Sequence, residues 1–320
     1  MNSELVVVSV PYKPFVSVIQ KGCILPNVKF LIVDAKTGFV WKTLFRIFLV
    51  LRLYSLALMC KMPRKEYLQF LVYSKNSSTR FLFWSPFFLT WWYAMGKLIK
   101  SNKKFCFCWG PVNNAANIHR LEYFIQMSKE DKFAFFSMNP YDAEKYEMQL
   151  ISQVYRRFDS LKENKIESDF YFLGKTKGRE KILSQIQKVL EEKKFKIDFR
   201  IFPDVPKEPV SFEENVLGAS KARCIVDIVS SKYRQNGMTL RPLEALFLGK
   251  KLITNYREIV DEDFYHPDNI FVVDEKNFSL EGIEDFMQKP IHKIDEEIVE
   301  RYEVNHWIQT YFLQGKENAK

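Results

Sequence analysis

Short apolar runs alternate with amphipathic stretches through the second half of the chain. Each run is five to eight residues long and rich in β-branched or aromatic residues, as is typical of a buried strand. The runs are DFYFLG (169–174), FKIDFRIF (195–202), RCIVDIV (223–229), KKLIT (250–254) and IFVVD (270–274). Helical spacing of apolar residues fills 177–193, 212–222 and 239–249. This alternation predicts a parallel sheet covered by helices on both faces.

The first half repeats the pattern less regularly. Its strand candidates are ELVVVSV (4–10), VKFLIVDA (28–35), FLFWS (81–85), KFCFCWG (104–110) and KFAFFSM (132–138). We therefore predict an α/β protein with two doubly wound, Rossmann-like domains. The polar segment 158–168 separates them, which gives a first domain of 1–160 and a second of 161–320. Residues 296–313 have helical spacing, and this C-terminal helix could pack back on the first domain.

Composition agrees with two folded cores. The 320 residues are 47% hydrophobic and include 29 Phe, far too aromatic for a disordered chain. Five scattered cysteines, with no Cys-x-x-Cys pair, argue against a disulfide framework or a zinc site. The N-terminus lacks the features of a signal peptide. We expect a cytoplasmic protein.

The two most apolar stretches, 44–60 and 81–99, are each short or interrupted for a membrane-spanning helix. Arg46 and Arg52 break the first, and Pro86 lies in the second. Because a spanning helix needs about 20 predominantly apolar residues, we expect none.

Charge is concentrated in the first half. Residues 1–160 carry 22 Lys and Arg against 10 Asp and Glu, whereas 161–320 carry 26 against 29. A basic, aromatic half could rest on the anionic inner face of the cell membrane as a peripheral protein. We expect no nucleic-acid partner, since no recognisable binding signature is present and the aromatics cluster in apolar runs. A basic surface with no partner remains the alternative.

The loop after strand 223–229 carries the strongest chemical signal, because ligands of open parallel sheets bind at the carboxyl ends of strands. It reads RQNGMTLRPLEALFLGKK (234–251), with Thr239 as a helix N-cap and Gly249 as its terminator. A helix start with free N–H groups, flanked by Arg234 and Arg241, suits a phosphate or pyrophosphate.

Glu244 lies one turn into that helix. At 100° per residue it falls beside the apolar stripe of the helix, on the side of the sheet. There its carboxylate could accept hydrogen bonds from ribose or sugar hydroxyls. The alternative is an N-terminal glutamate that is paired with Arg241 on an exposed helix turn.

These residues, with YFLGKTKGR (171–179) before them and DFYHPDNIFVVD (263–274) after them, resemble bacterial glycosyltransferases of the GT-B fold that build lipopolysaccharide or capsular polysaccharide. FSMNPYDAEKYEM (136–148) is similar to the segment that ends their N-terminal domain. The resemblance implies that the second domain holds a nucleotide-sugar donor, most commonly a UDP-sugar. It also implies a glycan or lipid-linked acceptor on the first domain, with reaction in the cleft between them.

The resemblance also implies roles for individual residues. Lys175, Lys177 and Arg179 would lie near the donor phosphates, and Phe202 would lie near the base. The pyrophosphate would accept hydrogen bonds from the N–H groups of Gly237, Met238 and Thr239, and Glu244 would bind the ribose. Many retaining members carry a second glutamate where this chain has Asn236, so the stereochemistry stays open. The first strand also lacks the glycine-rich turn common in these folds, which leaves the acceptor side undefined.

Sugar transfer needs stabilisation of a departing nucleoside diphosphate. Cationic side chains and a helix N-terminus can supply it without a metal or other cofactor, and Lys175, Arg179, Arg234 and Arg241 are the candidates. DED (261–263) spells a metal-binding Asp-x-Asp motif, but its late position disfavours that interpretation.

An inverting reaction also needs a general base. By residue type Asp142, Glu144 and His119 of the first domain qualify. The structural alternatives are a helix-start carboxylate for Asp142 and a helix-surface side chain for His119.

Two functions follow as hypotheses. The first is a metal-independent, hexosyltransferase-like glycosyltransferase acting on a growing lipopolysaccharide, capsule or other lipid-linked glycan. The second is a catalytically silent, GT-B-like nucleotide-binding partner subunit of a transferase complex. Fold alone does not separate them.

Overall fold

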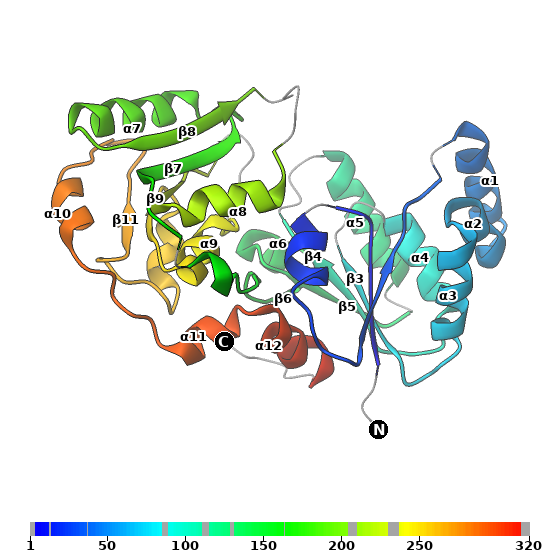
Figure 1. The fold of residues 1–320 in the computed structure, drawn as a ribbon. Helices are drawn as coiled ribbons and strands as arrows, with labels where there is room; N and C mark the ends of the chain where they lie inside the picture. Colours follow the sequence, from blue (N-terminus) through cyan, green and yellow to red (C-terminus); the bar gives the residue numbers. More distant parts are fainter. Residues whose placement is uncertain are drawn as a thin grey trace. The chain divides into compact units, whose positions relative to one another are not determined.

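A computed structural model describes residues 4–12, 14–36, 38–84, 89–110, 115–128, 131–162, 164–203, 210–229 and 237–314 (Figure 1). The chain forms two compact units. Unit 1 comprises residues up to Val16, Cys23–Ile151, and Ile308 onward. Unit 2 comprises Ser17–Gly22 and Ser152–Trp307.

Unit 1 is built on a six-stranded parallel sheet in the order β2-β1-β3-β4-β5-β6. Its strands are β1 (Leu5–Ser9), β2 (Val28–Ile32), β3 (Arg80–Trp84), β4 (Lys104–Cys108), β5 (Phe133–Ser137) and β6 (Gln149–Leu150). The five strands predicted in this half are present. The two-residue β6 escaped prediction because an edge strand this short has no periodicity of its own.

Six α-helices accompany the described strands of unit 1: α1 (Phe39–Val50), α2 (Tyr54–Lys61), α3 (Arg64–Ser74), α4 (Leu89–Leu98), α5 (Ala115–Ser128) and α6 (Pro140–Lys145). Side chains alternate along each strand, so Phe81 and Phe83 face the core beneath α1 to α5 (Figure 1). Trp84 and Phe107 face the other way, where the π-helical segment Phe15–Gln20 supplies Phe15.

Unit 2 has a five-stranded parallel sheet in the order β11-β10-β9-β7-β8. Its strands are β7 (Ser168–Lys175), β8 (Ile197–Phe202), β9 (Ala222–Asp227), β10 (Lys251–Thr254) and β11 (Ile270–Val272). All five were predicted, and the α/β prediction with parallel sheets is confirmed.

The helices of unit 2 cover both faces of that sheet: α7 (Glu180–Glu192), α8 (Phe212–Ser220), α9 (Arg241–Leu248), α10 (Ile283–Gln288), α11 (Glu296–Arg301) and α12 (Val304–Ile308), with short 3₁₀ turns at Asp159–Leu161 and Arg257–Asp261. Helices α7 and α10 pack on the face that carries Phe170 and Phe172, and α8 and α9 lie on the opposite face (Figure 1). Helix α9 ends before Gly249, whose φ of +63° makes the predicted left-handed stop.

The strand order creates a switch point in each sheet. In unit 2, β7 lies between β8 and β9, so the chain leaves β7 in one direction and then crosses to the other side. The same holds in unit 1 for β1, which lies between β2 and β3. The carboxyl ends of the two strands flanking such a point are where doubly wound sheets bind ligands.

The C-terminal pattern forms separate pieces instead of one helix. The backbone of Tyr155 forms an isolated parallel β-bridge with Glu303. The Tyr155 N–H donates to Tyr302 O at 2.8 Å, and the Tyr155 O accepts from Val304 N at 2.9 Å. These bonds divert the backbone between α11 and α12. The chain then enters unit 1 as a second π-helical segment, Gln309–Leu313, whose Phe312 packs on Phe105 and Phe136.

Within the parts of the chain that the structure describes, no helix combines the length and the apolar character needed to cross a bilayer. The stretch 44–60 divides between α1 and α2, with a turn between them.

Phe312 provides a test of the fold, since it is fully buried against two strands of unit 1. We expect Phe312→Ala to lower the free energy of unfolding by about 3–5 kcal/mol, because it leaves a large cavity. Urea unfolding measures the change. The control Val72→Ala alters a side chain on α3 that is 71% exposed, and we expect a change within about 0.5 kcal/mol. Equal effects of the two substitutions would contradict this packing.

Candidate functional site at the carboxyl edge of the second sheet

The turn after β7 brings a buried arginine back over the end of its own strand. Lys177 and Gly178 adopt positive φ angles of +47° and +78°, and α7 begins at Glu180. Positive φ is uncommon for a lysine and marks a tight, constrained turn. As a result Arg179 folds back, and its Nε and Nη2 donate to Lys175 O at 3.1 and 2.9 Å.

Two guanidinium groups meet over Gly174. A Cβ at this position would lie 2.9 Å from Arg179 Nη2 and 3.0 Å from Arg241 Nη2. Both groups also lie over the ring of Phe172, at 5.1 and 5.2 Å from its centroid. This close approach explains the glycine in YFLGKTKGR, because a side chain there would displace both arginines.

Asp227, the last residue of β9, joins these parts. Its carboxylate is fully buried: Oδ1 accepts from Thr239 Oγ1 at 2.9 Å and from Arg241 Nη1 at 3.2 Å, and Oδ2 accepts from Thr254 Oγ1 at 3.3 Å. Arg241 Nη2 donates in addition to Leu173 O at 2.7 Å. Our sequence reasoning missed Asp227. The available signal was a single carboxylate in an otherwise apolar strand.

The cluster carries net positive charge. Burial lowers the pKa of the Arg179 guanidinium to about 10, with the neighbouring Arg241 as a further cause, while Asp227 acts in the opposite direction. Arg179 therefore stays protonated near pH 7. Two arginines against one aspartate leave one positive charge over the strand ends. Lys175, exposed at the end of β7, adds another and pairs with no acid among the described residues.

Glu244 is buried inside unit 2, with only 2% of its surface exposed. Its Oε1 accepts hydrogen bonds from Tyr155 Oη at 2.9 Å and Asn215 Nδ2 at 3.0 Å. The alternative of an exposed helix-turn pair with Arg241 is therefore wrong. Burial raises the pKa of Glu244, against the lowering effects of Arg241 and of these hydrogen bonds. Because both described donors use Oε1, Oε2 remains the acceptor for a further donor.

The start of α9 offers fewer backbone donors than the sequence led us to expect. Leu240 occupies the N-cap position and Thr239 precedes it. The side chain of Thr239 still caps the helix start, since its Oγ1 accepts from Arg241 N at 3.2 Å. Pro242 has no N–H. In the first turn of α9, one N–H is therefore already bonded to Thr239 and another is missing, so fewer N–H groups are left for an anion. Arg234 lies outside the described residues.

Of the other predicted donor residues, Gly237 and Met238 are buried just before this helix, and Met238 O accepts from Gln153 Nε2 at 3.2 Å. Lys175 and Phe202 end β7 and β8 in register. These residues all belong to unit 2, as do Lys177, Arg179, Thr239, Arg241 and Glu244.

The general-base candidates belong to unit 1. Asp142 is buried in the first turn of α6, where Asn139 caps the helix by accepting from Asp142 N at 3.1 Å. Its placement is that of the predicted helix-start carboxylate. His119 is exposed on α5, as predicted for a helix-surface histidine, and Glu144 is exposed on α6.

Two residues of the acidic triplet 261–263 make internal contacts, and Asp261 is exposed. The single hydroxyl of Tyr302 is shared between two carboxylate oxygens, Glu262 Oε2 at 3.0 Å and Asp263 Oδ1 at 2.6 Å. Arg301 forms an ion pair with Asp263 at 2.6 Å. Glu262 and Asp263 therefore anchor the start of the C-terminal segment, which is a structural role for these two carboxylates.

No family model matches this sequence, and comparison with curated proteins finds none similar to it. The geometry of the strand ends and the chemistry of their side chains therefore carry the functional argument.

Asp227 and Arg241 allow a test of the site's construction. We expect Asp227→Asn to lower the free energy of unfolding by about 3–5 kcal/mol, because it leaves the part-buried Arg241 without its charge partner. The control Glu192→Gln breaks an exposed pair with Lys188 on α7, and about 1 kcal/mol or less is expected. In a double-mutant cycle, the loss for Asp227→Asn combined with Arg241→Met should be smaller than the sum of the two single losses. Additive losses would contradict the coupling.

Proposed function

We propose that this protein is a glycosyltransferase of the GT-B class, with a nucleotide-sugar donor bound at the carboxyl edge of β7 and β9. The observation that carries the proposal is Glu244, a buried carboxylate with one oxygen left for a ligand, in the same unit as a cationic strand-end cluster. Burying a carboxylate without a cation on it costs stability, and such groups concentrate at functional sites.

The donor's parts fit the described side chains by charge. Its diphosphate requires positive charge, which Lys175 and the cluster around Arg179 supply. Its ribose presents two neighbouring hydroxyls, and Glu244 Oε2 accepts hydrogen bonds from such a group. A charge-assisted bond of this kind inside a protein is shorter and stronger than a neutral one. A UDP-sugar is the donor that the resemblance favours.

Arg241 acts in this scheme as a positioning residue. Its guanidinium is already bonded to Asp227 and to Leu173 O, so it secures the start of α9. The developing charge of the leaving diphosphate is then balanced chiefly by Lys175 and by the net positive cluster, with no metal required.

One feature favours the second candidate function, a catalytically silent nucleotide-binding subunit. Both described guanidinium groups, those of Arg179 and Arg241, donate to acceptors of the protein itself. A site in which the arginines serve the fold can bind a nucleotide without promoting transfer. Release of nucleoside diphosphate from donor in the presence of acceptor separates the enzyme from the binding subunit.

Unit 1 has a surface suited to the acceptor. At the carboxyl edge of its sheet, Trp109 packs edge-on against Tyr12 and Trp84, with ring centroids 6.2 and 5.3 Å apart. Aromatic faces offer rigid apolar area with polar atoms at the rim, which matches the two-sided polarity of a sugar ring. We assign the glycan or lipid-linked acceptor to this edge.

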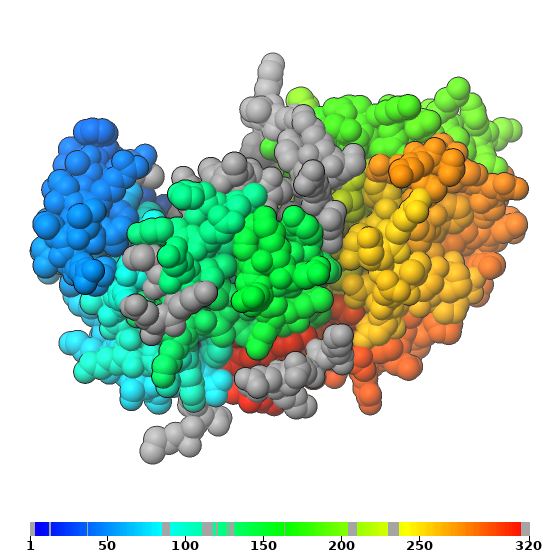
Figure 2. Space-filling view, turned by 180° about the vertical axis from the view of Figure 1, so that it is seen from behind, coloured from blue at the N-terminus to red at the C-terminus, as the bar shows by residue number. Residues whose placement is uncertain are grey.

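The α1–α2 hairpin suits an anionic membrane surface. Helix α1 buries only Phe45, and residues 39–61 contain no acidic residue and three exposed basic ones, Lys42, Arg46 and Arg52. Figure 2 shows this blue lobe standing out from unit 1. Its exposed apolar side chains are Phe39, Val40, Trp41, Ile47, Val50, Leu51, Leu53, Leu56 and Met59. Apolar side chains that insert, together with basic ones that meet anionic headgroups, are the two components of peripheral membrane binding.

Calorimetric titration of UDP, in buffer with EDTA, tests the donor site. We expect binding to wild type without metal, and a loss of roughly 1–3 kcal/mol for Glu244→Gln, because the charge-assisted bonds weaken. The melting temperature at pH 7 should not fall. Folding raises the pKa of Glu244, so the folded protein loses stability as the pH rises above the pKa that this carboxyl has in the unfolded chain. Glutamine does not ionise, so the substitution removes this loss of stability.

Glu281→Gln, at an exposed position of the same unit, is the matched control and should bind like wild type. Equal affinities of wild type and Glu244→Gln would remove Glu244 from the donor site. Binding that requires Mg²⁺ or Mn²⁺ would overturn metal independence.

Sedimentation with vesicles tests the hairpin. We expect the protein to pellet with phosphatidylglycerol vesicles, and less so as salt shortens the Debye length below about 8 Å. The double variant Phe39→Asp, Val50→Asp alters side chains that are 83% and 81% exposed, so it should lose vesicle binding with an unchanged melting temperature. Ile24→Asp, equally exposed outside the hairpin, should bind like wild type. Retention of binding by the double variant would exclude this surface.

A further inference from the structure

Unit 2 contains a cavity of about 310 Å³ at the opposite edge of its sheet from the donor site. It lies where β10 and β11 begin and α9 ends, and its lining includes Leu252, Ile270 and Gly249. Since parallel strands share one direction, this amino edge is distant from the carboxyl ends that carry Lys175 and Asp227. A volume of this size is in the range of small-molecule sites.

One wall of the cavity is apolar. Helix α9 presents Pro242, Ala245 and Leu246 to it, and Phe247 closes one side. These positions follow the spacing of one helical face, whereas Glu244 takes part in the hydrogen bonds of another. The cavity and the donor site therefore use different faces of the same helix.

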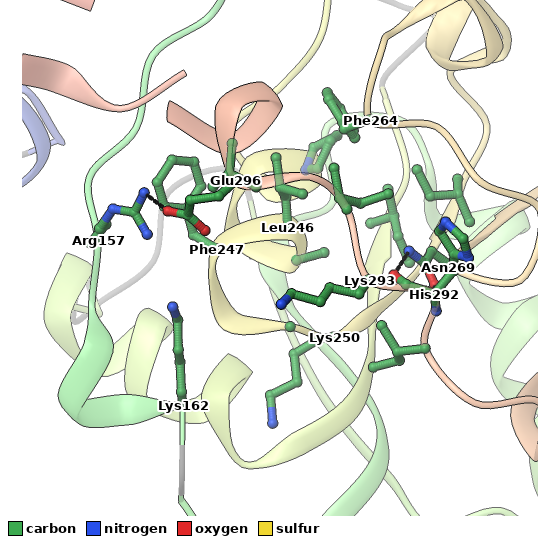
Figure 3. Close-up of a pocket in the computed structure, with 18 residues that line it drawn as sticks. Arg157, Lys162, Leu246, Phe247, Lys250, Phe264, Asn269, His292, Lys293 and Glu296 are labelled. Carbon is green, nitrogen blue, oxygen red and sulfur yellow. Dashed lines mark hydrogen bonds and ion pairs between the residues drawn. The ribbon is translucent and has the colours of Figure 1, made fainter. Parts of the chain in front are cut away.

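Lys250 is the unusual residue of the lining. Its surface is only 8% exposed, and its backbone N–H donates to Ala245 O at 2.9 Å. Its side-chain amine forms no hydrogen bond or ion pair with any residue that the structure describes. Burial lowers the pKa of its amine. Its stem is covered by protein, while its ammonium group points into the open region of the cavity (Figure 3). A lysine held in this way presents its charge to whatever fills the cavity, which suits an anion.

Its neighbour Lys251 shows the contrast. Lys251 is also buried, but its amine donates to Asp268 O and lies 4.4 Å from the centroid of the Phe286 ring. The amine of Lys251 therefore has partners within the protein and needs no ligand. The amine of Lys250 has no such partner among the described residues.

Further cations surround the same space. Figure 3 shows the amino groups of Lys162, Lys250 and Lys293 around one open region, with Arg157 and Phe247 beside it. Arg157 is neutralised by Glu296, and Lys162 by Asp159 at 2.9 Å. Lys293 has no acidic partner among the described residues, so it and Lys250 leave two positive charges next to an apolar wall.

We propose that this cavity binds a small amphiphilic anion, with a carboxylate or phosphate head between Lys250 and Lys293 and an apolar tail along Leu246 and Phe247. Inorganic phosphate would satisfy the amines but leave the apolar wall unfilled. A neutral alkyl chain would cover the wall but leave the two ammonium groups without a counter-ion. Only a ligand that has both parts satisfies the whole lining.

The test is titration of the full chain with four probes: decanoate and decyl phosphate below their micellar concentrations, decanol below its solubility limit, and inorganic phosphate. We expect the two amphiphilic anions to bind at least tenfold more tightly than decanol or inorganic phosphate. Lys250→Met should reduce their affinity at least tenfold without lowering the melting temperature, because methionine keeps the buried apolar stem and removes an amine whose charge burial disfavours. Lys293→Met should also weaken binding, and its exposed position makes misfolding no concern.

Lys251→Met is the matched control. It should lower the melting temperature, since it removes a satisfied buried amine, and it should leave decanoate affinity unchanged. UDP binding should be the same in wild type and Lys250→Met, which separates this site from the donor site. The proposal fails if Lys250→Met keeps the affinity of wild type for decanoate. It also fails if decanol, or inorganic phosphate, binds as tightly as the corresponding amphiphilic anion.

Discussion

The buried carboxylate of Asp227 is the contact on which the arrangement of unit 2 depends. It stands at the end of β9 and accepts from the start of α9, through Thr239 and Arg241, and from the end of β10, through Thr254. Arg241 extends the network to β7 by its bond to Leu173 O. A charge taken from water in this way is tolerated only when its partners are complete, so the network holds three strand ends and one helix together.

This network fixes the start of helix α9. The helix has Glu244 on one face and the amino-edge cavity, with Lys250, beside another. Glu244 lies on one side of the helix and Lys250 just beyond its end. Burial raises the pKa of Glu244 and lowers the pKa of Lys250, so in each case it favours the uncharged form. A core built for stability alone would hold apolar side chains at such positions. The two ligands that we propose, one with hydroxyl donors and one with an anionic head, would each meet one of these two groups of opposite charge.

The two units share an architecture and differ in surface chemistry. Both sheets are parallel and have their first strand between the second and third, and the carboxyl ends beside such a switch point are where doubly wound sheets bind ligands. Unit 2 lines that edge with arginines and a buried aspartate, whereas unit 1 carries aromatic rings there and an exposed apolar hairpin elsewhere. The difference shows why the fold by itself leaves function open and the side chains must decide it.

Local pattern was enough to determine the ten principal strands, the parallel sheets and the stop of α9 at Gly249, because apolar periodicity and glycine conformation act within a few residues. Helical spacing also predicted the inward position of Glu244, whereas the cationic turn after β7 was singled out by the family resemblance. The tertiary structure alone decided what those residues contact. Glu244 bonds to Tyr155, 89 positions away, and Arg241 to Leu173, 68 away. The break at Tyr302 and the isolation of Lys250 likewise arise from strand order, which places distant segments side by side and leaves no periodic signal in the sequence.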